Sequence, residues 1–97
     1  MINTHQHQLF ELGTVVATPG AISLLDELEF YPNELLGRHQ RGDWGDLDEH
    51  DREANFLAVE HGRRILSVYR IGVSSEVVWI ITEADRSVTT LLLPDEY

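Results

Sequence analysis

The chain has 97 residues, of which 17 are acidic and 7 are basic, and because all the basic residues are arginine, it lacks lysine and carries a formal net charge of −10. At this length a single small core must support any function. Because so small a core is only marginally stable, a homodimer is one expected source of added stability. A surface this negative repels phosphate backbones, which argues against direct binding of DNA or RNA. The absence of cysteine excludes disulfides, thiolate metal ligands and cysteine nucleophiles.

Residues 1–8 are polar and lack apolar periodicity, so we expect a flexible tail followed by one domain over residues 9–97. His5 and His7 in this tail supply two nitrogen ligands without a nearby third, which is too few for a metal site. No basic segment precedes an apolar run, and no stretch approaches about 18 successive apolar residues. We therefore expect no membrane segment and a cytoplasmic location.

The first half of the domain predicts one strand and then helices. The expected elements are a strand at 9–17 and helices at 19–29, 32–40 and 47–60. Thr18 places a capping hydroxyl before Pro19, which is a frequent first residue of a helix. Asp46 stands three residues ahead of Glu49, as in a capping box, and Gly62 is expected to end the third helix in a left-handed conformation.

After Gly62 the apolar period changes from helical to strand-like. We expect strands at 64–71, 76–82 and 88–93, joined by hairpin loops at 72–75 and 83–87. The central strand is apolar on both faces, so its second face is expected to be covered or to lie against a partner, with Trp79 largely buried. The order predicts an α+β domain with an N-terminal strand, two to three helices and a three-stranded antiparallel meander.

Three segments carry a resemblance to a known family: GDWGDL at 42–47, RILSVYR at 64–70 and WIITEADRSVTTLLLPDEY at 79–97. They resemble a family of small uncharacterised bacterial proteins found on plasmids and other mobile elements. The resemblance implies a bacterial host and a place in the conflict between mobile elements and their hosts. It supplies no established activity and no functional residue.

The order of elements is also similar to that of the RelE and BrnT class of ribonuclease toxins. Those toxins are basic, as RNA cleavage requires, whereas this chain is strongly acidic. The likeness therefore supports the expected fold, while the charge argues against toxin activity.

Acidic residues and histidines are the candidate metal ligands in this sequence. The acidic residues gather near the start of the third predicted helix: Asp43, Asp46, Asp48, Glu49, Asp51 and Glu53. Their spacing does not match a calcium loop and favours an interaction with the helix dipole. His39 shares the inner side of the second helix with leucines, which indicates a hydrogen-bonded core residue. His50 and His61 lie about 16 Å apart along one helix, so they cannot share an ion, and no metal or cofactor is expected.

Two polar segments form the candidate interaction surface, with residues Asp43, Trp44, Asp46, Glu83, Asp85 and Arg86. Trp44 lies between two glycines and is expected either in the core or as an exposed anchor for a partner. Asp85 is expected to bond amides of its own loop, and Arg86 to pair with Glu83 or Asp85. The same polar loop could also do acid-base chemistry, which leaves enzymatic activity undecided.

A second set, which could grip phosphate or a substrate, comprises Arg63, Arg64, Tyr69, Arg70 and Tyr97. Three hypotheses follow. The leading one is a small acidic interaction or regulatory module of a bacterial mobile element that binds a protein partner. The alternatives are a toxin-type ribonuclease or nucleotide-handling enzyme, and an inhibitor of a host defence complex that mimics nucleic acid.

Overall fold

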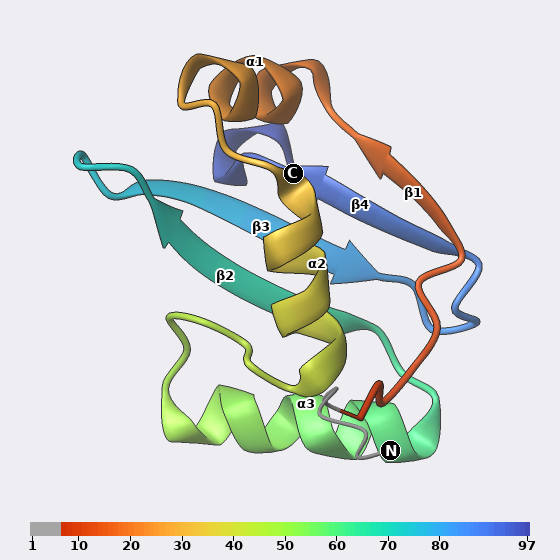
Figure 1. The fold of residues 1–97 in the computed structure, drawn as a ribbon. Helices are drawn as coiled ribbons and strands as arrows, with labels where there is room; N and C mark the ends of the chain where they lie inside the picture. The colour runs from red at the N-terminus through yellow and green to blue at the C-terminus, as the bar shows by residue number, and fades with distance from the viewer. Residues whose placement is uncertain (1–6) are drawn as a thin grey trace, which may run out of the picture.

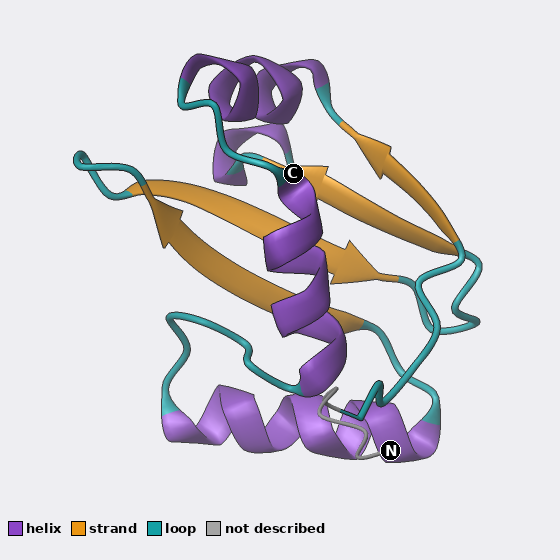
Figure 2. Cartoon of the chain, in the orientation of Figure 1, coloured by secondary structure: helices purple, strands orange, loops and turns teal. Residues whose placement is uncertain are grey.

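The structure, a computed structural model, describes residues 7–97, so most of the expected tail, including His5, lies outside the described residues. The elements in chain order are β1 (Thr14–Ala17), α1 (Pro19–Glu27), α2 (Pro32–Arg41), α3 (Glu49–His61), β2 (Ile65–Ile71), β3 (Glu76–Thr82), β4 (Val88–Leu92) and the 3-10 turn η1 (Pro94–Glu96) (Figure 1). The predicted α+β class is confirmed (Figure 2). Among residues 7–97, none of the helices combines the length and apolar content that a membrane crossing requires.

The four strands form one mixed sheet in the order β1-β4-β3-β2. Strands β2, β3 and β4 are antiparallel neighbours, as the predicted meander requires, with Trp79 opposite Val68 and Leu92. Strand β1 adds to β4 in parallel, with Val15 opposite Thr89, so the sheet as a whole is not a simple antiparallel meander. The three helices carry the chain from the β1 edge to the β2 edge, which leaves β1 and β2 as the two outer strands (Figure 1).

Local capping explains where the helices begin and end. The hydroxyl of Thr18 accepts a hydrogen bond from the amide of Ala21 at 3.2 Å, which confirms the predicted start of α1. Helix α3 begins two residues later than expected, because Asp48 rather than Asp46 is its cap and accepts from the Asp51 amide at 2.8 Å. Gly62 ends α3 with φ +67, as predicted.

The first strand is shorter than the expected 9–17. Residues 9–13 form a loop that begins beside the C-terminal end of α2, held by a hydrogen bond from the Leu9 amide to the Gln40 carbonyl at 2.8 Å. The side-chain amide of Gln40 donates in turn to the Phe10 carbonyl at 2.9 Å. These contacts satisfy backbone groups that a strand would otherwise pair.

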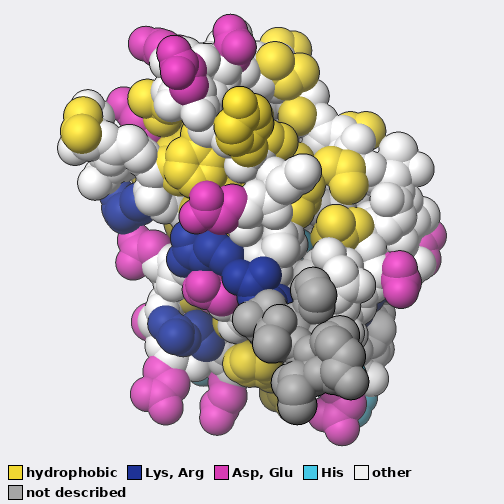
Figure 3. Space-filling model, viewed as in Figure 1, with side chains coloured by type: hydrophobic (Ala, Val, Ile, Leu, Met, Phe, Trp, Pro, Cys, Tyr) yellow, Lys and Arg dark blue, Asp and Glu magenta, His cyan; other side chains and the backbone are white. Residues whose placement is uncertain are grey.

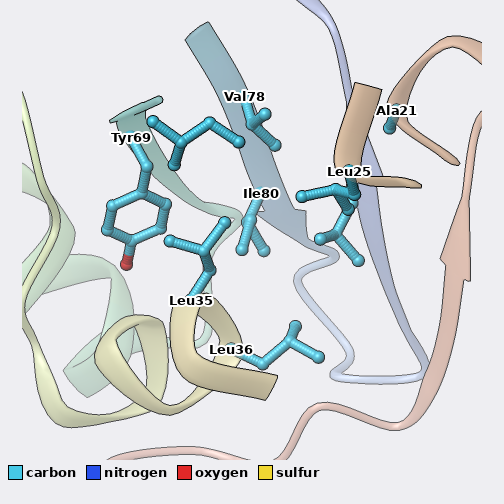
Figure 4. Packing of buried hydrophobic residues seen from close by; sticks show 9 residues of the cluster. Ala21, Leu25, Leu35, Leu36, Tyr69, Val78 and Ile80 are labelled. Carbon is cyan, nitrogen blue, oxygen red and sulfur yellow. The ribbon is translucent and has the colours of Figure 1, made fainter. Parts of the chain in front are cut away.

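Helices α1 and α2 pack on one face of the sheet, and the main core lies between them and the strands (Figure 4). Its buried members include Ala21, Leu25, Leu35, Leu36, Tyr69, Val78 and Ile80. A second cluster joins Phe10, Trp44 and Ala58 to Ile65, and it fills the space between the N-terminal loop, α3 and β2.

Trp79 lies on the opposite face of the sheet, where it is less buried than the core residues but is not exposed. This residue points away from the helices, as its neighbours Val78 and Ile80 point toward them. The cover over Trp79 comes from Tyr97, whose ring centroid lies 5.6 Å away in an edge-on arrangement. A single aromatic ring shields the indole less than a packed helix would.

Candidate functional site

The outer edge of β2 is closed by the rest of the chain. The side-chain amide of Asn55 on α3 pairs with both backbone groups of Leu66, accepting from its amide at 3.2 Å and donating to its carbonyl at 2.7 Å. Two residues along the strand, Val68 donates to the Trp44 carbonyl at 3.0 Å and accepts from the Asp46 amide at 2.6 Å. Gly45, between them, has φ +82, and any side chain there would overlap the Val68 carbonyl. No strand of another molecule can pair with these groups while they are occupied.

The outer edge of β1 is open by contrast, since no described strand lies beyond it. The amides of Thr14 and Thr18 donate to the carbonyls of Ser87 and Leu91 on the β4 side, each at 2.9 Å. Because backbone groups alternate in direction along a strand, those of Val15 and Ala17 point outward. The side chains of Val15 and Val16 are 42% and 44% exposed. An unpaired edge with exposed valines is a template for adding another strand.

An apolar groove runs beside this edge, between β1, α1 and the start of α2. It has a volume of about 560 Å³. The residues that line it are Val15, Val16, Ala17, Ile22, Leu25, Asp26, Glu29, Phe30, Tyr31, Pro32 and Leu91. Four of the eight large hydrophobic side chains that are exposed in residues 7–97 line this one groove. Figure 3 shows hydrophobic side chains gathered over this upper part of the face, with arginines over its middle. Such a concentration indicates a binding surface.

The charged side chains that line the groove are both acidic, Asp26 and Glu29. Neither forms an ion pair with a described residue. Glu29 follows the C-cap of α1 and has φ +52, a left-handed conformation that glycine adopts more easily. The Phe30 amide donates to the Leu25 carbonyl at 2.9 Å and so completes the usual helix-ending hydrogen bond. The groove therefore combines an apolar floor with a negative rim.

A buried polar network surrounds His39, which has no exposed surface. The Thr89 hydroxyl donates to the Leu12 carbonyl at 2.7 Å, and the Thr82 hydroxyl lies 2.7 Å from that of Thr89. Thr82 therefore donates to Thr89 and accepts from His39 Nε2 at 2.9 Å. The Ser67 hydroxyl, 2.6 Å from Nδ1, then donates to the ring. This assigns a neutral imidazole with its proton on Nε2 and confirms that His39 is a hydrogen-bonded core residue.

Ser67 and His39 are as close as a catalytic serine and its general base, but their surroundings do not fit catalysis. Both side chains are fully buried, so no substrate reaches the hydroxyl. The second ring nitrogen meets a threonine hydroxyl and no described carboxylate. Burial, together with the positive charge of Arg86, lowers the pKa of His39 to about 3, so the ring stays neutral at physiological pH. The network is structural and ties α2 to three strands.

In the loop 83–87, Arg86 does not form the expected ion pair with Glu83 or Asp85. Its guanidinium turns inward and donates to the carbonyls of Arg63, Glu83, Ala84 and Ala58 at 2.7, 3.1, 3.1 and 3.0 Å. It also lies 5.6 Å from the centroid of the Phe10 ring. These contacts close the end of α3 and the hairpin, so Arg86 holds the fold together.

The two acids of this loop have separate partners. Asp85 accepts from the amide and hydroxyl of Ser87 at 3.0 and 2.6 Å, as expected for a residue that bonds its own loop, and these bonds lower its pKa. Glu83 instead pairs with Arg64 at 3.3 Å. The loop thus offers an acidic, self-bonded tip but no convergent set of catalytic groups.

Trp44, in the turn 43–45, is buried. Of the two expected alternatives, the structure therefore confirms that it is a core residue and not an exposed anchor. Its ring lies 5.3 Å from that of Phe56 and 6.0 Å from that of His39. The indole Nε1 has no hydrogen-bond partner among the described residues. Asp43 forms a close ion pair with Arg38 at 2.7 Å, which lowers the pKa of its carboxyl, and Asp46 pairs with Arg70 at 2.7 Å. The turn serves mainly to cover the β2 edge.

The arginine and tyrosine set does not converge on one site. Tyr69 is buried, donates to the Asp43 carbonyl at 2.7 Å and has its pKa raised to about 12 by burial. Arg70 is paired at the β2 edge, and the Arg63 carbonyl helps to hold Arg86. Arg64 and Tyr97 do meet, with 2.7 Å between the guanidinium and the phenol, but Glu83 shares that guanidinium. Among the described residues, this set does not bring several unpaired arginines together in a way that could bind phosphate.

His50 and His61 lie exposed at opposite ends of α3. Within residues 7–97, no three histidines or carboxylates come together in a geometry that could hold a metal ion.

Sequence reasoning missed the residues that decide the two sheet edges. The Asn55 amide is buried and pairs with backbone, but one asparagine in a helical pattern gives no such signal. For the groove there was a signal: Ile22, Asp26 and Glu29 recur at helical spacing, with Glu29 just past the end of α1. Their significance for binding becomes clear only from the structure, which places them beside the unpaired edge of β1.

Comparison of the chain with family models, curated proteins and solved structures found no match. Function therefore has to be inferred from the surfaces of the molecule itself.

Proposed function

We propose that the protein is a small interaction module that binds an extended segment of a partner protein by adding it as a strand to the free edge of β1. The leading hypothesis from the sequence, a module that binds a protein partner, is kept. The proposed binding surface is now the β1 edge and no longer the two polar turns. Strand addition supplies affinity through main-chain hydrogen bonds and specificity through pockets for alternate side chains.

The observation that carries the proposal is the difference between the two edges of one sheet. At β2, the Asn55 amide and the backbone of residues 44–46 occupy the outward groups of Leu66 and Val68. At β1, the outward groups of Val15 and Ala17 have no described strand beside them. Proteins usually protect exposed edges, so an edge left open beside an apolar groove indicates a place for a partner.

The alternative hypotheses find less support in the geometry. A ribonuclease needs a basic, accessible cluster, whereas most arginines here are paired with carboxylates or with backbone carbonyls. Mimicry of nucleic acid rests on the overall charge of −10, for which the exposed acids of α3 are one contributor. An origin on a mobile element stays a prediction from the resemblance.

The test uses a phage-displayed library of random heptapeptides panned against the immobilised protein. Val15→Pro removes the outward amide that an added strand needs, while the hydrogen bonds from β1 to β4 stay intact. We expect the selected peptides to lose at least tenfold in affinity for this variant. In the complex of the parent protein, the amide of Ala17 should exchange its hydrogen more slowly.

The matched control is Val73→Pro. Val73 is fully exposed at the second position of the turn from Gly72 to Ser75, a position that proline favours. This variant should bind as the parent does. The proposal fails if no peptide is selected, or if Val15→Pro retains its fold by circular dichroism and binds the selected peptides with unchanged affinity.

A further inference from the structure

We propose that the β1 groove selects a partner segment in which apolar residues are accompanied by lysine or arginine, and that Asp26 and Glu29 are the residues that recognise the positive charge. This inference rests on the proposed function. It adds the chemistry of the partner and names the residues that determine specificity.

The floor of the groove defines the apolar half of that chemistry. Leu25 and Leu91 are buried beneath it, while Ile22 and Tyr31 stand at its margins with 56% and 81% of their surface exposed. A strand added to β1 would direct every second side chain to the face of the sheet that carries α1. Those side chains would fill the groove and remove its apolar surface from water.

The rim defines the charged half. No arginine lines the groove, so the formal charge of its lining is −2, from Asp26 and Glu29. Because these carboxylates have no ion-pair partner among the described residues, a cation from the partner would not have to displace one. Both carboxylates are exposed at the rim, so they act on partner choice and on the rate of association, and their effect weakens as the salt concentration rises.

The same charges argue against the other occupants. Pairing of β1 with β1 of a second copy would bring like rims together on molecules that each carry −10. A nucleic acid would meet the same repulsion. A basic, apolar segment of a protein satisfies the edge, the floor and the rim together.

The selection described above also tests this inference. Peptides selected at low salt should contain lysine and arginine at least twofold above their frequency in the library and few acidic residues. A selected peptide should bind Asp26→Asn/Glu29→Gly at least tenfold more weakly than the parent. Glycine suits the left-handed φ of +52 at position 29, so this change should not lower the melting temperature.

General attraction to an acidic protein is controlled by Glu49→Gln/Glu53→Gln, which removes the same charge from α3. That variant should lose less than threefold in affinity. Equal losses in the two double variants would overturn the inference, as would selected peptides without basic enrichment. If peptides without basic enrichment still bound Val15→Pro more weakly than the parent, the proposed strand addition would hold and only the inference about positive charge would fail. A dimer in sedimentation experiments that Val15→Pro dissociates would show that the occupant is a second copy and overturn the inference.

Discussion

The buried imidazole of His39 should make the protein sensitive to mild acid. Its pKa falls from 6.5 to about 3 on folding, because burial and the charge of Arg86 oppose protonation. The unfolded chain therefore binds this proton more tightly than the folded protein does. The stability from the neutral ring is complete above pH 6.5 and is lost as the pH falls toward 3.

The size of this effect follows from the same pKa values. Each tenfold change in proton affinity is worth about 1.4 kcal/mol, so the full loss approaches about 5 kcal/mol, and about half of it appears between pH 7 and pH 4.5. The carboxyls of Asp43, Asp85 and Glu96 have pKa values lowered from 3.8 or 4.5, so their contributions are lost at lower pH. Above pH 4.5, His39 therefore contributes most of the pH dependence expected from these four groups. For a domain of this size, such a loss is a large part of the total stability.

The assay is denaturant unfolding at several pH values between 7 and 4.5, followed by the fluorescence of the two tryptophans, of which Trp44 has its ring 6.0 Å from that of His39. His39→Gln keeps hydrogen-bonding groups but cannot titrate, so its free energy of unfolding should depend less on pH. If this variant does not fold, the imidazole resonances of the parent give the same information by NMR. Parallel stability curves, or titration of His39 in the folded protein near pH 6.5, would refute the reasoning.

Two further predictions concern Arg86, whose contacts differ from expectation, and Trp79, which lies on the face of the sheet away from the helices. Arg86→Ala should lower the free energy of unfolding by about 2–3 kcal/mol, because it leaves four carbonyls without their charged donor, and Arg86→Lys should recover only part of this in urea unfolding. A loss below about 0.5 kcal/mol would contradict the inward role of the guanidinium. Trp79→Ala should cost about 1–3 kcal/mol, less than the 3–5 kcal/mol typical of a fully buried tryptophan, and should remove the iodide-quenchable fluorescence, since Trp44 is buried. Fluorescence that remains equally quenchable would contradict this.

Local signals determined much of the fold without tertiary information. Thr18 and Pro19 start α1 and Gly62 ends α3, because capping depends on a few neighbouring backbone groups. The change from helical to strand period after Gly62 likewise depends on the order of side chains alone. The meander followed from short loops between strands, which leave antiparallel pairing as the simplest connection.

Contacts between residues far apart in the sequence required the tertiary structure. The apolar pattern of β3 does not say which face the helices cover, and only the structure places Trp79 on the face away from them. Arg86 was expected to pair with its neighbours, yet it reaches the carbonyl of Ala58, 28 residues away.

The candidate site shows the same division. The sequence by itself determined that the chain is acidic, and the helical spacing of Ile22, Asp26 and Glu29 could be seen in it. The tertiary structure decided that β1 lies at the end of the sheet while Asn55 closes the opposite edge. Strand order arises from the packing of all elements together, and no short segment encodes it.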